Sequence, residues 1–250
     1  RLQQWGTLEG QRLTLNAASL DNRGKLLGVE ALTLHVADAI FNSGYLLSQG
    51  DASIQTTALE NTGQWQAKRI DVNAARLTNS GSMLGVDALT LTLAERLDNS
   101  ASGKLFSQGI ASINAANVVN LGEWQASQLV VQANRFDNQG RMQGDALLSI
   151  ETVVTPAPLT GRIAALGAQT AQPSLTNQGT LLSGGELHLN GQQIENRGTL
   201  LSDAMHIGAH SLRNHGDITA LTTLNAELSS VLNNDGAISG ENVAIVAERI

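Results

Sequence analysis

Cysteine is absent from this chain of 250 residues, and aromatic residues make up only 3% of it. Without cysteine there is no disulfide bridge and no thiolate nucleophile, and the chain is compatible with an oxidising compartment. With so few aromatic rings, a core has to be filled by Leu, Ile, Val and Ala. Such a core suits a narrow interior built from thin layers.

Long apolar runs and blocks of like charge are also missing. No segment approaches the roughly 18 consecutive apolar residues of a membrane-spanning helix. Since repeat sequence begins directly at Arg1, we expect no signal peptide in these residues. The net charge of −7 is spread along the chain, and no basic stripe is present to bind a nucleic-acid backbone. We therefore expect no membrane span and no nucleic-acid partner.

What the chain does contain is one short phrase repeated from end to end: an apolar residue, a spacer, Asn, a spacer, Gly and a brief apolar run. Examples are SLDNRGKLLG at 19–28, RLTNSGSMLG at 76–85 and SLTNQGTLLS at 174–183. The key residues are Asn22, Asn42, Asn61, Asn79, Asn99, Asn120, Asn138, Asn177, Asn196, Asn214 and Asn234. They follow one another at steps of 18 to 21 positions, with one step of 39. A fixed period of this length is typical of a stack of coils.

Each Asn-x-Gly predicts a turn, since Gly accepts positive φ freely and Asn tolerates it better than most residues. Strand-like sequence follows, as where Leu32 and Leu34 alternate with Thr33 and His35. Alternation with period 2 over such short runs indicates strands with one buried face.

A helical or leucine-rich solenoid fits this pattern poorly. With 25 glycines in the chain, two helices cannot fit within about 19 residues per unit, and the Asn here precedes Gly in a turn. We therefore predict an all-β parallel β-helix of about 12 coils of 18–21 residues, with two or three short strands per coil. At about 4.8 Å of rise per coil, the rod would be about 55 to 60 Å long.

The Asn column has a structural interpretation. Stacked amides in successive coils can hydrogen-bond along the rod, as they do in cross-β assemblies. A second column, two residues after the turn Gly, should point inward as an apolar stack. Its members are Leu26, Leu46, Trp65, Met83, Leu105, Trp124 and Met142. We expect the two tryptophans in that column to lie in the core and not to form sugar-binding platforms.

The sequence also repeats over three coils. GQWQAKRIDVNAARLTN from Gly63 matches GEWQASQLVVQANRFDN from Gly122 without gaps, and the superperiod is 57 to 59 residues. This duplication indicates a structural unit, because a catalytic site is needed once. The third copy is interrupted, so we expect coils over 1–154, an inserted loop over 155–174 and further coils over 175–250.

The interruption holds all three prolines of the chain and lacks the Asn-Gly turn. Pro156, Pro158 and Pro173 cannot donate ladder hydrogen bonds, and a short helix around Arg162 is compatible with the sequence. Loops on repeat scaffolds often carry binding. These four residues therefore mark a candidate partner-binding loop.

No catalytic chemistry stands out in the repeats. A pectin-degrading β-helix would gather acidic and basic residues on one face, whereas the outward column consists mainly of Thr and Ser. His188 and His206 fall at equivalent positions of neighbouring coils, about 5 Å apart. Two imidazoles so placed could share a metal, but two solvated side chains are the simpler interpretation. We expect no catalytic residue, no cofactor and no metal, and thus no enzyme.

The phrase LxNxGxLxSxxxLxLxAxxLxN, at Leu175–Asn196 and Leu77–Asn99, closely resembles the haemagglutinin repeats of filamentous-haemagglutinin-like exoproteins. These very large bacterial proteins are exported by two-partner secretion, and they include adhesins and contact-dependent growth inhibition toxins. The resemblance implies a right-handed β-helical shaft, secreted and held at the bacterial cell surface. It also implies an outer-membrane secretion partner that binds a region outside this chain.

The expected function is that of a non-enzymatic shaft segment of a secreted exoprotein, serving adhesion or presentation of a distal module. Its expected partner is a host- or bacterial-cell-surface receptor or glycan. Two alternatives remain open: the stalk of a contact-dependent growth inhibition toxin, and a carbohydrate-active β-helix enzyme.

Overall fold

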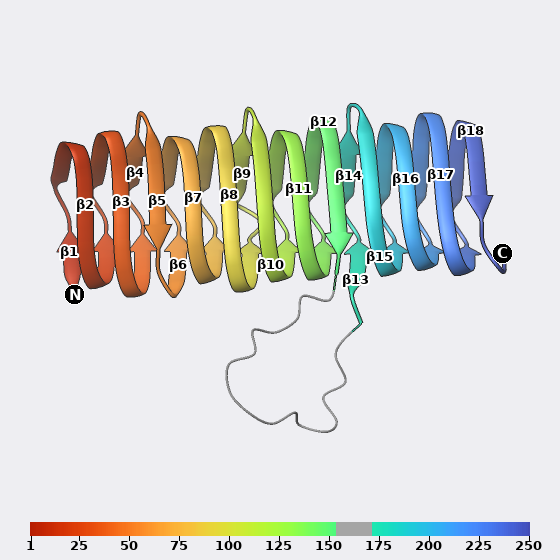
Figure 1. Cartoon of the computed structure of the whole chain (residues 1–250), viewed down its shortest axis with the longest axis horizontal. Coiled ribbons are helices and arrows are strands. Elements are labelled where there is room, and N and C mark those ends of the chain that lie inside the picture. Colours follow the sequence, from red (N-terminus) through yellow and green to blue (C-terminus); the bar gives the residue numbers. More distant parts are fainter. Residues whose placement is uncertain (154–171) are drawn as a thin grey trace, which may run out of the picture.

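The computed structural model describes residues 1–153 and 172–250, which form a single parallel sheet of 18 strands wound into a solenoid of about twelve turns (Figure 1). The strands are β1 (Leu2–Gln4), β2 (Thr7–Asn22), β3 (Lys25–Asn42), β4 (Tyr45–Ser48), β5 (Asp51–Gln55), β6 (Ala58–Asn61), β7 (Gln64–Asn79), β8 (Ser82–Asn99), β9 (Lys104–Ser107), β10 (Ile110–Asn120), β11 (Glu123–Asn138), β12 (Arg141–Thr152), β13 (Ser174–Asn177), β14 (Thr180–Ser183), β15 (Glu186–Asn196), β16 (Thr199–Asn214), β17 (Asp217–Asn234) and β18 (Ala237–Val246). These two ranges include no helix long and apolar enough to span a membrane. The predicted all-β parallel β-helix is confirmed.

Each complete coil consists of three strand segments, which we call A, B and C; β18, the last, has segments A and B. In one coil they are the separate strands β4, β5 and β6. In the preceding coil the same segments are fused into β3, whose successive parts pair with β4, β5 and β6 in parallel register. From the amino-terminal end, coil 1 is β2, coil 2 is β3, coil 3 is β4 to β6, coil 4 is β7, coil 5 is β8, coil 6 is β9 and β10, coil 7 is β11, coil 8 is β12 and β13, coil 9 is β14 and β15, coil 10 is β16, coil 11 is β17 and coil 12 is β18.

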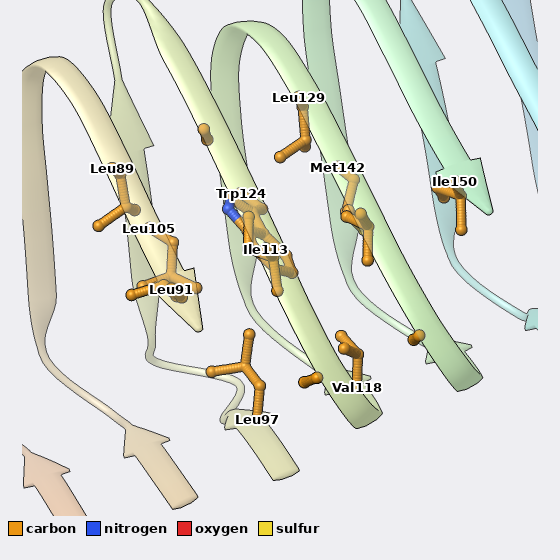
Figure 2. Close-up of a cluster of buried hydrophobic side chains, with 14 of the residues drawn as sticks. Leu89, Leu91, Leu97, Leu105, Ile113, Val118, Trp124, Leu129, Met142 and Ile150 are labelled. Carbon is orange, nitrogen blue, oxygen red and sulfur yellow. The ribbon is translucent and has the colours of Figure 1, made fainter. Parts of the chain in front are cut away.

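The core is a set of apolar columns inside the coils. Trp124 lies in register between Leu105 of one neighbouring coil and Met142 of the other, and all three side chains are buried (Figure 2). Trp65 has the same kind of neighbours three coils earlier. The two indoles therefore belong to the core, as predicted from the position after the turn glycine.

Segment B ends with alanine in both of these coils. In the coil of Trp65 the residue is Ala74, which pairs with Leu93 of the next coil, and Ala133 takes the corresponding place in the coil of Trp124. The three-coil superperiod thus places the same residue types at equivalent core positions.

The turn glycines are needed because successive turns are packed in contact. A Cβ atom on Gly44 would lie 2.1 Å from the carbonyl oxygen of Gly24 in the preceding coil, and one on Gly81 would lie 2.1 Å from that of Gly63. None of the glycines in the described ranges has a φ in the left-handed region. The prediction that these glycines supply positive φ is therefore wrong: they supply close approach between backbones.

Candidate functional site

The eleven asparagine side chains form one continuous row of hydrogen bonds, the Asn ladder. The Nδ2 atom of each donates to the Oδ1 atom of the next, at 2.7 to 2.9 Å, from Asn22 through to Asn234. All but Asn234 are buried. Every bond runs in the same direction, from a donor in one coil to an acceptor in the next.

Every ladder amide except that of Asn22 also donates to the glycine carbonyl of its own turn. The Nδ2 atom of Asn79 donates to the carbonyl of Gly81 at 3.2 Å and to that of Lys104, just after the next turn, at 3.3 Å. The backbone carbonyl of Asn79 accepts the Ser100 N–H at 2.9 Å. Because the polar groups of the buried amide are satisfied, it stabilises the turn instead of straining it. We propose a structural role for the ladder.

At its amino-terminal end the ladder meets Gln4, a turn residue that the Asn pattern does not reveal. Gln4 of β1 pairs in register with Asn22, and its backbone carbonyl accepts the Arg23 and Gly24 N–H groups as a turn Asn does. Its longer side chain donates instead to the carbonyl of Lys25 at 3.3 Å. The buried Oδ1 of Asn22 therefore has no hydrogen-bond partner among the described residues. The signal for this turn is the glycine two residues after Gln4, in the phrase LQQWGTLEG.

Exposed aromatic side chains occur on the first turns of the rod. Trp5 is 63% exposed, and Phe41 and Tyr45 are each 48% exposed. The guanidinium of Arg23 lies 4.5 Å from the centre of the Trp5 ring and forms two 3.1 Å hydrogen bonds with Asp21. A shallow groove beside them is lined by Arg1, Asp21, Arg23, Phe41, Glu60 and Thr62. This surface combines an aromatic ring with charges of both signs.

The two surface histidines stack at the predicted spacing. His188 and His206 are in register, and their ring centres lie 5.0 Å apart with the rings perpendicular. The Nε2 atom of His188 lies 2.9 Å from Oε2 of Glu186, close enough for an ion pair when the imidazole is protonated, although the geometry is not that of a hydrogen bond. In the described ranges, no three side chains of His, Cys, Asp or Glu converge as metal ligands would.

The candidate loop residues are only partly described. Pro156, Pro158 and Arg162, with the short helix expected around Arg162, lie outside the described residues. Pro173 is buried immediately before β13, and its carbonyl accepts the Gln193 N–H at 3.4 Å. Pro173 is therefore part of the wall of the rod.

Comparison with curated proteins finds nuclease relatives. The chain is 37% identical, over 83% of its length, to a protein named Deoxyribonuclease CdiA from Dickeya dadantii. It is 30% identical to a tRNA nuclease CdiA of Escherichia coli strain NC101, over 97% of its length, and to a 16S rRNA endonuclease CdiA of Enterobacter cloacae, over 92%. The chain spans only 7% to 8% of these relatives. No family model and no solved structure matches it.

These names overturn three expectations drawn from the sequence. The expected main function, a non-enzymatic shaft for adhesion or display, is wrong, because the relatives are named as nucleases of DNA, tRNA and 16S rRNA. The expectation of no enzyme is wrong for the same reason, and the partner expectation, a surface receptor or glycan with nucleic acid excluded, is wrong in excluding nucleic acid. They rested on charge and side chains within a segment that makes up 7% to 8% of those proteins.

Proposed function

Because the chain belongs to the CdiA family of contact-dependent growth inhibition proteins, which are two-partner secretion exoproteins, we propose that it is a stalk segment of such a toxin. In this proposal the whole toxin is a nuclease. Members of the family are exported to the cell surface, and we place this segment outside the bacterium that makes it, on that bacterium's surface.

One observation carries the proposal: the same segment matches relatives named for three different substrates. Identity is 37% to the deoxyribonuclease and 30% to both the tRNA nuclease and the 16S rRNA endonuclease. A segment that selected the nucleic acid would be expected to differ between those proteins. We therefore assign the choice of substrate to a part of the toxin beyond this match.

The geometry suits a stalk because its hydrogen bonds run along the rod. Both the strand pairs between coils and the Asn ladder from Asn22 to Asn234 lie in that direction. Stretching the rod would lengthen these bonds in every coil at once, and bending it would lengthen those on the outer side of the bend. At about 4.8 Å per coil, about twelve coils give a stiff segment of about 55 to 60 Å.

An in-register deletion in the whole toxin tests the proposal. Removing residues 62–120 takes out three coils and joins Asn61 to the equivalent turn at Leu121, which shortens the rod by about 14 Å. We expect the purified toxin to keep its nuclease activity. The matched control removes residues 71–130, which joins the buried side chains of Ile70 and Val131 directly within segment B and so shifts the register by one residue inside a strand; we expect poor yield of folded toxin. Loss of nuclease activity in a folded in-register variant would contradict the proposal.

A further inference from the structure

The corner between segments B and C has two sizes. In coil 1 it consists of Ala18 alone, whereas in coil 2 it consists of Ala37 and Asp38, so the strand register shifts by one residue at this point. The wider corner recurs in coil 5, as Ala94 and Glu95. A corner of two residues therefore occurs once per three-coil superperiod.

The two-residue corner also occurs near the carboxy-terminal end of the rod. Coil 11 has Ser229 and Ser230 at this corner, opposite the single His210 of coil 10. Wide corners in coils 2, 5 and 11 follow a spacing of three coils, which places another wide corner in coil 8. Coil 8 is the coil in which β12 ends at Thr152 and β13 begins at Ser174.

In coil 8 the two corner positions are still filled. Val153 follows Thr152 and donates its N–H to Ala133 of the preceding coil at 3.0 Å. Pro173 precedes Ser174, and its carbonyl accepts an N–H from the following coil, as the carbonyl of Ser230 does in coil 11. The additional residues 154–172 thus enter at the bond between the first and second corner residues.

The coils on either side are unaffected by this entry. Segment B of β12 pairs with β11 and β15, and β13 pairs with the same two strands. The Asn ladder also continues from Asn138 to Asn177 at 2.8 Å. The strand pairs and the ladder bond of coil 8 are therefore complete on both sides of this bond.

We propose that the wide B–C corner is an insertion port built into the superperiod. Its two residues are exposed in coils 2 and 5, and the second has no counterpart in the neighbouring one-residue corners. A segment can be added between them while every residue that pairs in register keeps its partner. A one-residue corner has no such bond, because its single residue links two paired segments directly.

The ports of coils 2, 5, 8 and 11 lie at the same edge of the rod, where β12 ends and β13 begins (Figure 1). Successive ports are three coils, or about 14 Å, apart. Segments added at different ports would therefore be displayed on one side of the stalk. This arrangement holds whether or not the whole toxin is a nuclease.

Insertion of a second copy of residues 154–172 into the full chain tests the port. Placed between Ala94 and Glu95, it should shift the thermal midpoint by less than about 3 °C, with the β-type circular dichroism spectrum kept. Placed after Ala75, the one-residue corner of coil 4, it should lower the midpoint by more than about 8 °C or abolish the cooperative transition.

A Gly/Ser segment of the same length, inserted between Ala37 and Asp38 and compared with insertion after Ala18, separates the site from the inserted sequence. Tolerance at the wide corner with loss at the narrow one supports the port for both segments. Equal tolerance at the two corner types, or equal loss at both, overturns it.

Discussion

The Nδ2 atom of Asn138 donates a 2.8 Å hydrogen bond to the Oδ1 atom of Asn177, although 39 positions separate the two residues. Its neighbours in the ladder show the ordinary spacing: 18 positions separate Asn120 from Asn138 and 19 separate Asn177 from Asn196. The longer separation in sequence does not interrupt the ladder, so the amides form one cooperative row along the rod.

Substitution within the ladder should cost more than substitution at its end. Asn120→Ala leaves the buried Nδ2 of Asn99 and Oδ1 of Asn138 without their ladder partner, and we expect a loss of about 2 to 3 kcal/mol in the free energy of unfolding. Asn234→Ala, at the exposed last position, should cost less than about 1 kcal/mol. Urea denaturation of both variants measures the difference. Equal losses would argue against buried amide pairing.

Turn glycines should tolerate a methyl group only where no coil lies against them. Gly81→Ala places a Cβ atom 2.1 Å from the Gly63 carbonyl oxygen, and we expect a loss of at least about 2 kcal/mol because two backbones must separate. Gly6→Ala meets nothing within 4 Å and serves as the control. Thermal denaturation of the two variants compares them. A stable Gly81→Ala protein would refute the contact between turns.

The buried indoles should be the most costly side chains to truncate. Trp124→Ala removes a fully buried ring between Leu105 and Met142, and we expect a loss of about 3 to 5 kcal/mol. Trp5→Ala removes an exposed ring whose main contact is Arg23, so its cost should be about 1 kcal/mol or less. Chemical denaturation with fluorescence detection reports both values. Similar costs would mean that Trp124 is not in the core.

Completing the ladder at its first turn should stabilise the rod. In Gln4→Asn the shorter amide can reach the unpartnered Oδ1 of Asn22, which Gln4 leaves without a donor. We expect a gain of about 0.5 to 1.5 kcal/mol in the free energy of unfolding. Gln3→Asn changes the adjacent exposed side chain by the same methylene and should be neutral. A destabilised Gln4→Asn variant would show that the contact with Lys25 matters more.

Much of the fold could be predicted because each structural requirement restricts the residue type at a fixed position of the repeat. The inward column requires a large apolar residue at a fixed place after Gly, and Trp65 and Trp124 occupy it. Side chains at equivalent positions of successive coils stack on each other, so the sequence spacing alone placed His188 and His206 about 5 Å apart. In a solenoid, residues that lie one repeat apart in the sequence are neighbours in space.

Other features depend on contacts that no single coil reveals. Gln4 escaped notice because it breaks the Asn pattern while keeping the turn. The role of Gly44 was misjudged because its neighbour, the Gly24 carbonyl, belongs to the coil before. The port in coil 8 depends on a one-residue difference between adjacent corners, which becomes visible only when the strands are in register.

The function could not be predicted from the candidate residues, because a stalk and an adhesive shaft have the same physical requirements. Both need a continuous core and uniform coils, and neither requirement depends on the activity of another part of the protein. These residues contain no basic stripe, but that absence does not predict the activity of the relatives, which are named as nucleases.

Exchange of this segment between relatives tests the account most directly. The chain replaces the matching segment of the Dickeya dadantii deoxyribonuclease, to which it is 37% identical, and cleavage of DNA, tRNA and 16S rRNA by the purified chimaera is measured. The account predicts that the chimaera still cleaves DNA at a rate like that of the parent protein. A folded chimaera that loses DNA cleavage, or that gains cleavage of RNA, would contradict it.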